Sequence, residues 1–334
     1  MAGEKKRSIV LREDIRIRSA AGIGGKREGQ GPLRSRFDRI YEDAYLGQDT
    51  WEKAEQKLLA DCYELSLEKA GISRDALDCI FAGDLLAQCI SSAMAAKDSQ
   101  VPYFGLYGAC STITEALSLA ALCLESRQFS TALCYTGSHF CSAERQFRFP
   151  LEYGGQRPPS SQWTVTGAGA ALLQRGGSGP RISVLTPGRI VDAGINDPNS
   201  MGAAMAPAAA DSLLRHFEDT GRDPGYYDAV FTGDLGALGH DILQKLMKDE
   251  GIELGCNYMD CGVLIYDLNT QDVHAGGSGA GCCASVLCSH ILKGMEDGIW
   301  NRVLVAATGA LMSPLSCQQG ASIPGICHAV AIER

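Results

Sequence analysis

The chain has 334 residues, of which 45% are hydrophobic and 21% charged, and its formal net charge is −9. This length and composition are typical of a globular protein with one large domain or two medium ones. The acidic balance argues against nucleic acid as a partner, because no cluster of lysine and arginine offsets it.

The sequence also argues against membrane spans, a secretory signal and disulfide bonds. No apolar stretch reaches the roughly 18 residues that a spanning helix needs, and the first residues lack the apolar core of a signal peptide. The 14 cysteines lie mostly in apolar runs, without the spacing of a disulfide framework. We therefore expect reduced thiols in a cytosolic compartment. Because no C-x-x-C pair occurs, we expect no zinc site.

Residues 1–47 form a basic, glycine-rich segment to which the pattern assigns no helix or strand. Its glycines lack the G-x-x-x-x-G-K-[ST] order of a phosphate-binding loop. Thr50 and Gly71 then mark the start and end of a predicted helix of about twenty residues. Residues 76–81 follow as a predicted buried strand.

The stretch Gly108–Thr112 precedes a second predicted helix, in which apolar residues recur at helical spacing up to Leu124. Thr112 and Glu115 have the spacing of a capping box, so the helix should begin close to Cys110. A thiol at a helix N-terminus lies near the positive end of the helix dipole. That position favours the thiolate, or an anion bound beside the sulfur.

Two passages recur along the chain at fixed offsets. Residues 68–85 match residues 218–235 without a gap at an offset of 150, and both end in Gly-Asp-Leu. A weaker match at an offset of 172 pairs residues 133–137 with 305–309 and sets Cys110 opposite Cys282. We infer two duplicated α/β halves, which we place at residues 1–175 and 176–334.

The remaining pattern alternates strands with helices. Residues 139–162 read as a polar loop. Predicted strands are 131–138, 167–174, 181–185, 262–267, 302–307 and 326–332, and a further helix is predicted at 280–295. Such alternation indicates an α/β fold with largely parallel or mixed sheets covered by helices.

A duplicated α/β chain with a Gly-Ala-Cys-Ser turn at the start of a buried helix resembles the thiolase superfamily. Within it, the sequence is most similar to a sporulation family of endospore-forming bacteria. The stretches that carry this closer resemblance are residues 81–86, 108–112, 138–139, 143–150, 152–156, 164–170 and 260–262. The resemblance implies a five-layer α-β-α-β-α fold built from two duplicated halves, with the cysteine at the N-terminus of a central helix.

The resemblance also implies a function. It predicts a protein that binds dipicolinic acid, free or as its calcium chelate, and aids its uptake into the developing spore. The protein would work with membrane proteins of the same operon, lie peripherally at the inner spore membrane and form a homodimer. No cofactor is implied, apart from calcium as part of the ligand.

Condensing enzymes of the superfamily need a general base and an oxyanion hole beside the cysteine. Where the resemblance places these residues, the chain has Gly233-Asp234 and Gly277–Gly281, without a histidine. This favours a ligand pocket made from a retired active site, with Cys110 as a vestigial nucleophile. One alternative is an active acyltransferase with Cys110 as nucleophile and His240 or His274 as base. Another is an assembly scaffold with an unused pocket.

Five residues are candidate ligand contacts on these grounds: Asp84, Cys110, Ser111, His139 and Cys261. Four of them have a purely structural alternative: a turn for Asp84, an exposed loop for His139, and core packing for Cys110 and Cys261. A group of arginines and phenylalanines could close over a planar dicarboxylate or form an interface. Its members are Arg145, Phe147, Arg148 and Phe149.

Overall fold

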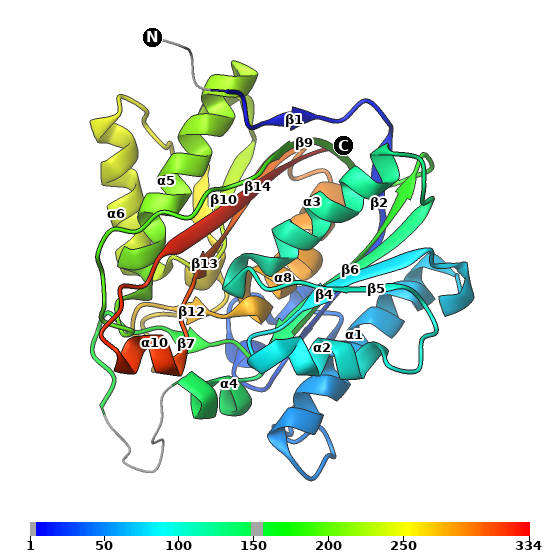
Figure 1. Ribbon diagram of the computed structural model, residues 1–334, viewed down its shortest axis with the longest axis horizontal. Helices are drawn as coiled ribbons and strands as arrows, with labels where there is room; N and C mark the ends of the chain where they lie inside the picture. Colours follow the sequence, from blue (N-terminus) through cyan, green and yellow to red (C-terminus); the bar gives the residue numbers. More distant parts are fainter. Residues whose placement is uncertain (1–4, 148–155) are drawn as a thin grey trace.

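The computed structural model describes residues 5–147 and 156–334. In it, ten strands form two five-stranded halves that have the same strand order (Figure 1). The first half has the order β5-β4-β6-β8-β2 and the second β11-β10-β13-β14-β9. In both, the order is the third, second, fourth, fifth and first strand along the chain. The strands of the first half are β2 (Ile15–Gly24), β4 (Cys79–Gly83), β5 (Tyr103–Gly105), β6 (Thr131–Ser138) and β8 (Gly167–Arg175).

The second half contains β9 (Arg181–Thr186), β10 (Ala229–Thr232), β11 (Tyr258–Asp260), β13 (Arg302–Ala310) and β14 (Gly325–Glu333). The halves join where β2 pairs with β9 at Arg16 and Arg181. Two short strands extend the edges of this junction, β1 (Ile9–Val10) on β9 and β3 (Arg39–Ile40) on β2. A separate parallel pair, β7 (Trp163–Thr164) and β12 (Gly277–Ser278), lies near the end of the central helices.

Helices cover both halves and fill the space between them, which gives the five layers (Figure 1). The first half is covered by α1 (Trp51–Ala70) and α2 (Ile90–Ala96), the second by α5 (Met201–Thr220) and α6 (Gly236–Asp249). The central layer contains α3 (Thr112–Glu125) and a long helix made of α8 (Ala280–Val286), the π-helical η8 (Leu287–Ile291) and α9 (Leu292–Glu296). The predicted five-layer fold is thus confirmed.

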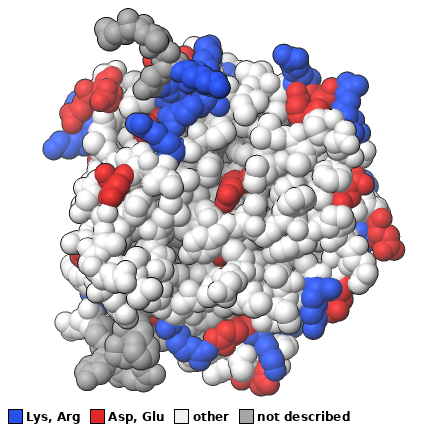
Figure 2. Space-filling model, viewed as in Figure 1, with Lys and Arg blue, Asp and Glu red and all other residues white. Residues whose placement is uncertain are grey.

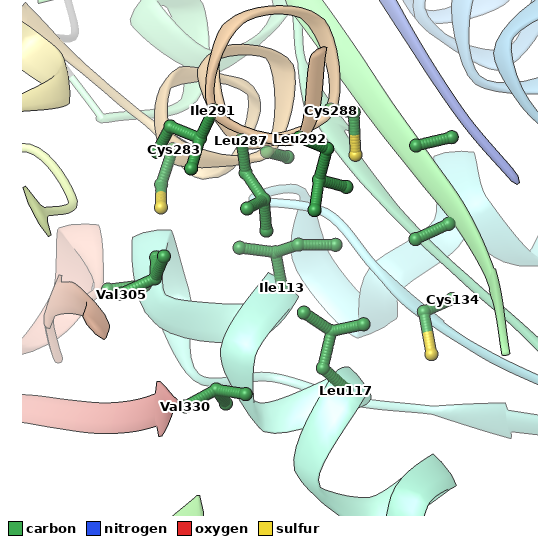
Figure 3. Packing of buried hydrophobic residues seen from close by; sticks show 14 of the residues in the cluster. Ile113, Leu117, Cys134, Cys283, Leu287, Cys288, Ile291, Leu292, Val305 and Val330 are labelled. Carbon is green, nitrogen blue, oxygen red and sulfur yellow. The ribbon is translucent and has the colours of Figure 1, made fainter. Parts of the chain in front are cut away.

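The main hydrophobic core lies where the two central helices meet (Figure 3). Ile113 and Leu117 of α3 point toward Leu287 and Ile291 of the opposing helix, and all four are fully buried. Each helix therefore buries an apolar side in the central layer, and this packing stabilises both helices.

Several predicted elements are confirmed. Thr50 caps α1 by accepting a hydrogen bond from the Lys53 amide, and Gly71 ends it in the left-handed conformation with φ 67°. Strands β6, β8, β9, β13 and β14 lie where the alternation placed them, within one to three residues.

Two local predictions are wrong, and one segment without a prediction forms a strand. Residues 140–147, predicted as loop, form α4 (Phe140–Phe147), in which Phe140, Ala143 and Phe147 recur at helical spacing. The strand predicted at 262–267 is absent, because the Asp260 side chain accepts from the Val263 amide and starts the short helix α7 (Cys261–Leu264). The segment to which no strand was assigned contributes β2, and its glycines at 22 and 24 lie in that strand.

The expected capping box at α3 is also not formed. A 3₁₀ turn, η5 (Ala109–Ser111), precedes the helix. The Thr112 hydroxyl accepts from the Gly108 amide at 3.0 Å and donates to the Ala109 carbonyl at 2.7 Å. Thr112 thus stabilises the turn that carries Cys110.

The remaining short helices lie at the periphery. They are η1 (Glu28–Gln30), η2 (Arg34–Arg36), η3 (Arg74–Ala76), η4 (Ala87–Cys89), η7 (Pro224–Tyr226) and α10 (Pro314–Gln318). Among the helices in the described ranges, none is long and apolar enough to cross a membrane.

We expect Leu117→Ala to lower the free energy of unfolding by about 2–5 kcal/mol, because it leaves a void between the central helices. Leu119→Ala is the matched control, since Leu119 lies on the same helix but is 37% exposed. That variant should change stability by less than about 0.5 kcal/mol. Urea denaturation measures both, and equal losses would contradict the packing described here.

Candidate functional site

Cys110 lines a cavity of about 60 Å³ at the start of α3. The cavity is mostly apolar, and its polar side chains come from Cys110, Tyr107, Glu144, Thr164 and Ser278. The described residues that line it are Leu85, Tyr107, Ala109, Cys110, Ala143, Glu144, Phe147, Thr164, Pro198, Met201, Ser278, Gly279, Ala310 and Met312.

Asp234 lies behind the cavity and organises its polar wall. Its carboxylate accepts hydrogen bonds from the Ser278 hydroxyl at 2.7 Å, the Thr308 hydroxyl at 2.8 Å and the Gly279 amide at 3.0 Å. Burial raises the pKa of Asp234, while the two hydroxyl donors act in the opposite direction. One carboxylate thus links the loop after β10, β12 and β13.

The thiol of Cys110 faces this network, with its Sγ 3.9 Å from the Ser278 Oγ. Burial raises the pKa of the Cys110 thiol well above its ordinary value, and the charge and hydrogen-bond acceptor of Asp234 raise it further. This direction is opposite to the thiolate that the sequence favoured, whereas the alternative of an anion bound beside the sulfur stays a prediction. Desolvation and the carboxylate of Asp234 raise the pKa of the thiol by more than the helix dipole lowers it.

Glu144 is the one charged side chain among the described residues that line the cavity. It is 3% exposed, and it accepts a hydrogen bond from the Thr164 hydroxyl at 2.9 Å. The cavity therefore presents a carboxylate to a ligand, in addition to the hydroxyls of Thr164 and Ser278.

Of the five candidate residues, the structure places Cys110 on the cavity wall and the other four outside the described lining. The Ser111 hydroxyl donates to the Gly108 carbonyl at 2.7 Å and closes the turn. Asp84 accepts from the Ser92 amide and hydroxyl, both at 2.7 Å, and from the Leu86 amide at 2.8 Å. It therefore holds the loop between β4 and α2.

His139 and Cys261 have structural contacts. The His139 Nε2 lies 2.7 Å from the Ala44 carbonyl, and its Nδ1 accepts from the Cys141 amide at 3.2 Å. Burial lowers the pKa of His139, so the imidazole is neutral and joins α4 to the loop before α1. Cys261 is fully buried and contacts Cys283, which together with burial raises the pKa of its thiol.

The two histidines considered as a base do not line the cavity. His240 stacks on Tyr258 with ring centroids 4.5 Å apart, and His274 lies 3.5 Å from the Asp272 carboxylate. Of the arginine and phenylalanine group, Phe147 lines the cavity and Arg145 pairs with Glu52. Arg148 and Phe149 lie outside the described residues.

Sequence reasoning did not include Asp234 and Ser278 among the ligand contacts, although it identified both places as those where a histidine is missing. The repeat pairs Asp234 with Asp84, and the structure shows that the second of the two turns faces Cys110. Contacts with the other half of the protein decide which of the two duplicated aspartates faces Cys110. The repeat alone therefore does not predict it.

A second buried carboxylate, Glu55 of α1, lies near Asp84. It is fully buried and hydrogen-bonded to the Ser142 hydroxyl. Burial and the charge of Asp84 raise the pKa of Glu55 to about 8. Within residues 5–147 and 156–334, no group of three or more His, Cys, Asp or Glu side chains is arranged to hold a metal ion.

Solved structures with the same architecture define the class of this protein. The chain is similar to 3-oxoacyl-[acyl-carrier-protein] synthase III of Aquifex aeolicus, at 14% identity and a TM-score of 0.58, over 96% of this chain and all of that one. A variant of Xanthomonas campestris OleA aligns at 15% identity with a TM-score of 0.64, over 98% and 100% of the two chains. The fold is thiolase-like.

Within that class, the chain belongs to the stage V sporulation protein AD (SpoVAD) family, whose model matches residues 5–333. It is 42% identical to stage V sporulation protein AD of Bacillus subtilis over 329 residues, which cover 98% of this chain and 97% of that protein. The predicted resemblance is confirmed, and the chain is a sporulation protein with a thiolase-like fold.

We expect Asp234→Asn to accelerate alkylation of Cys110 by iodoacetamide at pH 7, by about tenfold for each unit that the thiol pKa falls. The substitution removes the negative charge that disfavours the thiolate. Peptide mass spectrometry measures the rate at Cys110 separately from the other cysteines. Asp84→Asn, in the duplicated turn, is the matched control and should leave the rate unchanged. Equal rates in both variants would contradict the role given to Asp234.

We expect Glu55→Gln to reduce the loss of stability as the pH rises from about 4.5 to about 8. The folded protein keeps the Glu55 proton across this window whereas the unfolded chain releases it, so this group favours folding at low pH and less so as pH rises. The slope should change by up to about 1.4 kcal/mol per pH unit, measured by urea denaturation at several pH values. Glu68→Gln, at an exposed site on the same helix, should keep the wild-type slope.

Proposed function

We propose that this protein binds dipicolinate, as its calcium chelate, at the Cys110 cavity and does not act as an acyltransferase. The observation that carries the proposal is the environment of Cys110: burial and the negative charge of Asp234 raise the pKa of its thiol, and no histidine lies among the described lining residues. On this proposal, the protein keeps the pocket of a condensing enzyme without the histidine that would activate the nucleophile.

Two properties of the cavity support the calcium chelate as the ligand. Calcium prefers oxygen ligands, and the site offers the carboxylate of Glu144 with the hydroxyls of Thr164 and Ser278. The apolar remainder of the wall suits the flat ring of the ligand.

We further propose that the protein acts in uptake of dipicolinate into the developing spore, peripherally at the inner membrane and with membrane proteins of its operon. We also propose a homodimer that forms along β5, the last strand of its half. Phe104 on β5 and Met94 on α2 are 45% and 38% exposed. Charged side chains are sparse over the middle of the face that carries α3 and β14 (Figure 2).

We expect saturable binding of dipicolinate in isothermal titration calorimetry when calcium is present, with weaker binding in its absence. Ala310→Leu should abolish the binding, because Ala310 lines the cavity and leucine adds three carbon atoms there. Ala321→Leu, at an exposed position, is the matched control and should bind like the wild type. Picolinate lacks one carboxylate and isophthalate lacks the ring nitrogen, so these compounds test whether binding requires each group. Unchanged binding by Ala310→Leu would place the ligand elsewhere.

We expect no acyl group on Cys110 after incubation with acyl-coenzyme A at neutral pH, because the thiol stays protonated. Intact-protein and peptide mass spectrometry measure this directly. The Cys110→Ala variant identifies any acylation of the other cysteines. A stoichiometric adduct on Cys110 would instead support the acyltransferase alternative.

A further inference from the structure

The Cys110 cavity adjoins a surface groove, and the residues that line both form the wall between them. Four residues, Leu85, Tyr107, Phe147 and Met312, line both the cavity and the groove. The groove has a volume of about 340 Å³ against about 60 Å³ for the cavity. Its other lining residues are Leu86, Ala87, Gln88, Cys89, Gln146, Ser313 and Pro314.

The cavity in this conformation is too small for a planar dicarboxylate. Its volume corresponds to about two water molecules, whereas ligand sites commonly measure about 300–1,000 Å³. The cavity and the groove together would fall within that range. A ligand that reaches Cys110 therefore requires one wall of the cavity to move.

The wall toward the groove has the side chains that can move. Met312 is partly exposed and lies between the end of β13 and α10. Tyr107 is 42% exposed, and Phe147 is the last residue of α4. A methionine has three rotatable bonds and adapts readily to its surroundings. Leu85, by contrast, is buried in the loop that Asp84 holds.

Much of the remaining wall is fixed by backbone packing. A Cβ on Gly279 would lie 2.8 Å from the Ser138 Oγ, so this part of the wall has no room to yield. Ser278 is held by Asp234, and Glu144 by Thr164. Met201 is the other methionine of the cavity, but it does not line the groove.

We propose that the cavity and the groove are two parts of one ligand site, and that the ligand reaches Cys110 from the groove when Met312 and Phe147 move aside. These two side chains then set the size of the molecule that is admitted. The identity of the ligand rests on the proposed function. The route from the groove to Cys110 depends only on the residues of the wall, so it can be tested without dipicolinate.

The test compares labelling of Cys110 by a small reagent, methyl methanethiosulfonate, and a bulky one, N-phenylmaleimide. Peptide mass spectrometry reports the rate at Cys110, because the chain has 13 other cysteines. The ratio of bulky to small rates isolates steric access, since a change in thiol pKa affects both reagents. Met312→Ala should raise this ratio by about tenfold, because it removes the side chain that closes the wall.

Met201→Ala is the matched control: it makes the same substitution in the same cavity on the side away from the groove. It should change the ratio by less than about twofold if the wall toward the groove controls access. A larger ratio for Met201→Ala than for Met312→Ala would overturn the proposal, and so would an unchanged ratio in both. If Met312→Ala does not fold, the same ratio is measured for Phe147→Ala, because Phe147 also lines both the cavity and the groove. Absence of dipicolinate binding would reject the proposed function and leave this labelling result intact.

Discussion

The structure depends on the direct contact of the central helices with the strands beside them. A Cβ on Gly169 of β8 would lie 2.0 Å from the Ala284 carbonyl of α8, and one on Gly281 of α8 would lie 2.2 Å from the Gly167 carbonyl. In the second half, a Cβ on Gly309 of β13 would lie 2.3 Å from the Gly108 carbonyl of the Cys110 turn. Only glycine allows these approaches. The contact at Gly309 places the Cys110 turn directly against β13 of the second half.

This close packing explains why the two duplicated turns have different roles. Asp84 and Asp234 follow equivalent strands in their halves, but Asp84 binds residues of its own loop whereas Asp234 binds Ser278, Gly279 and Thr308. The N-terminus of α3 lies over the second turn. As a result, a carboxylate faces the cysteine, and the same acceptor that orders the wall raises the pKa of the thiol. Cys110 thus keeps its place at the N-terminus of a central helix, and burial together with Asp234 raises the pKa of its thiol.

Much of the fold could be predicted because it follows from local signals. The caps at Thr50 and Gly71, the apolar runs of β6, β8 and β13, and the offset of 150 are all visible in the sequence. The helix at Phe140–Phe147 was missed because it is short and half of its residues are polar, so that only one side is apolar. Asp260 was not seen as a cap, so the residues after it were predicted as a strand.

The sequence by itself determined the architecture, the duplication, the family and the position of Cys110 at the start of a central helix. These follow from periodicity, turn residues and motifs, which act over short stretches of chain. Only the tertiary structure decided that Asp234, and not Asp84, faces the thiol, and that Ser111, His139 and Cys261 have structural contacts. The first outcome depends on packing between residues more than a hundred positions apart, such as Cys110 and Ser278, and the pKa of the Cys110 thiol depends on burial, which reverses the effect of the helix dipole.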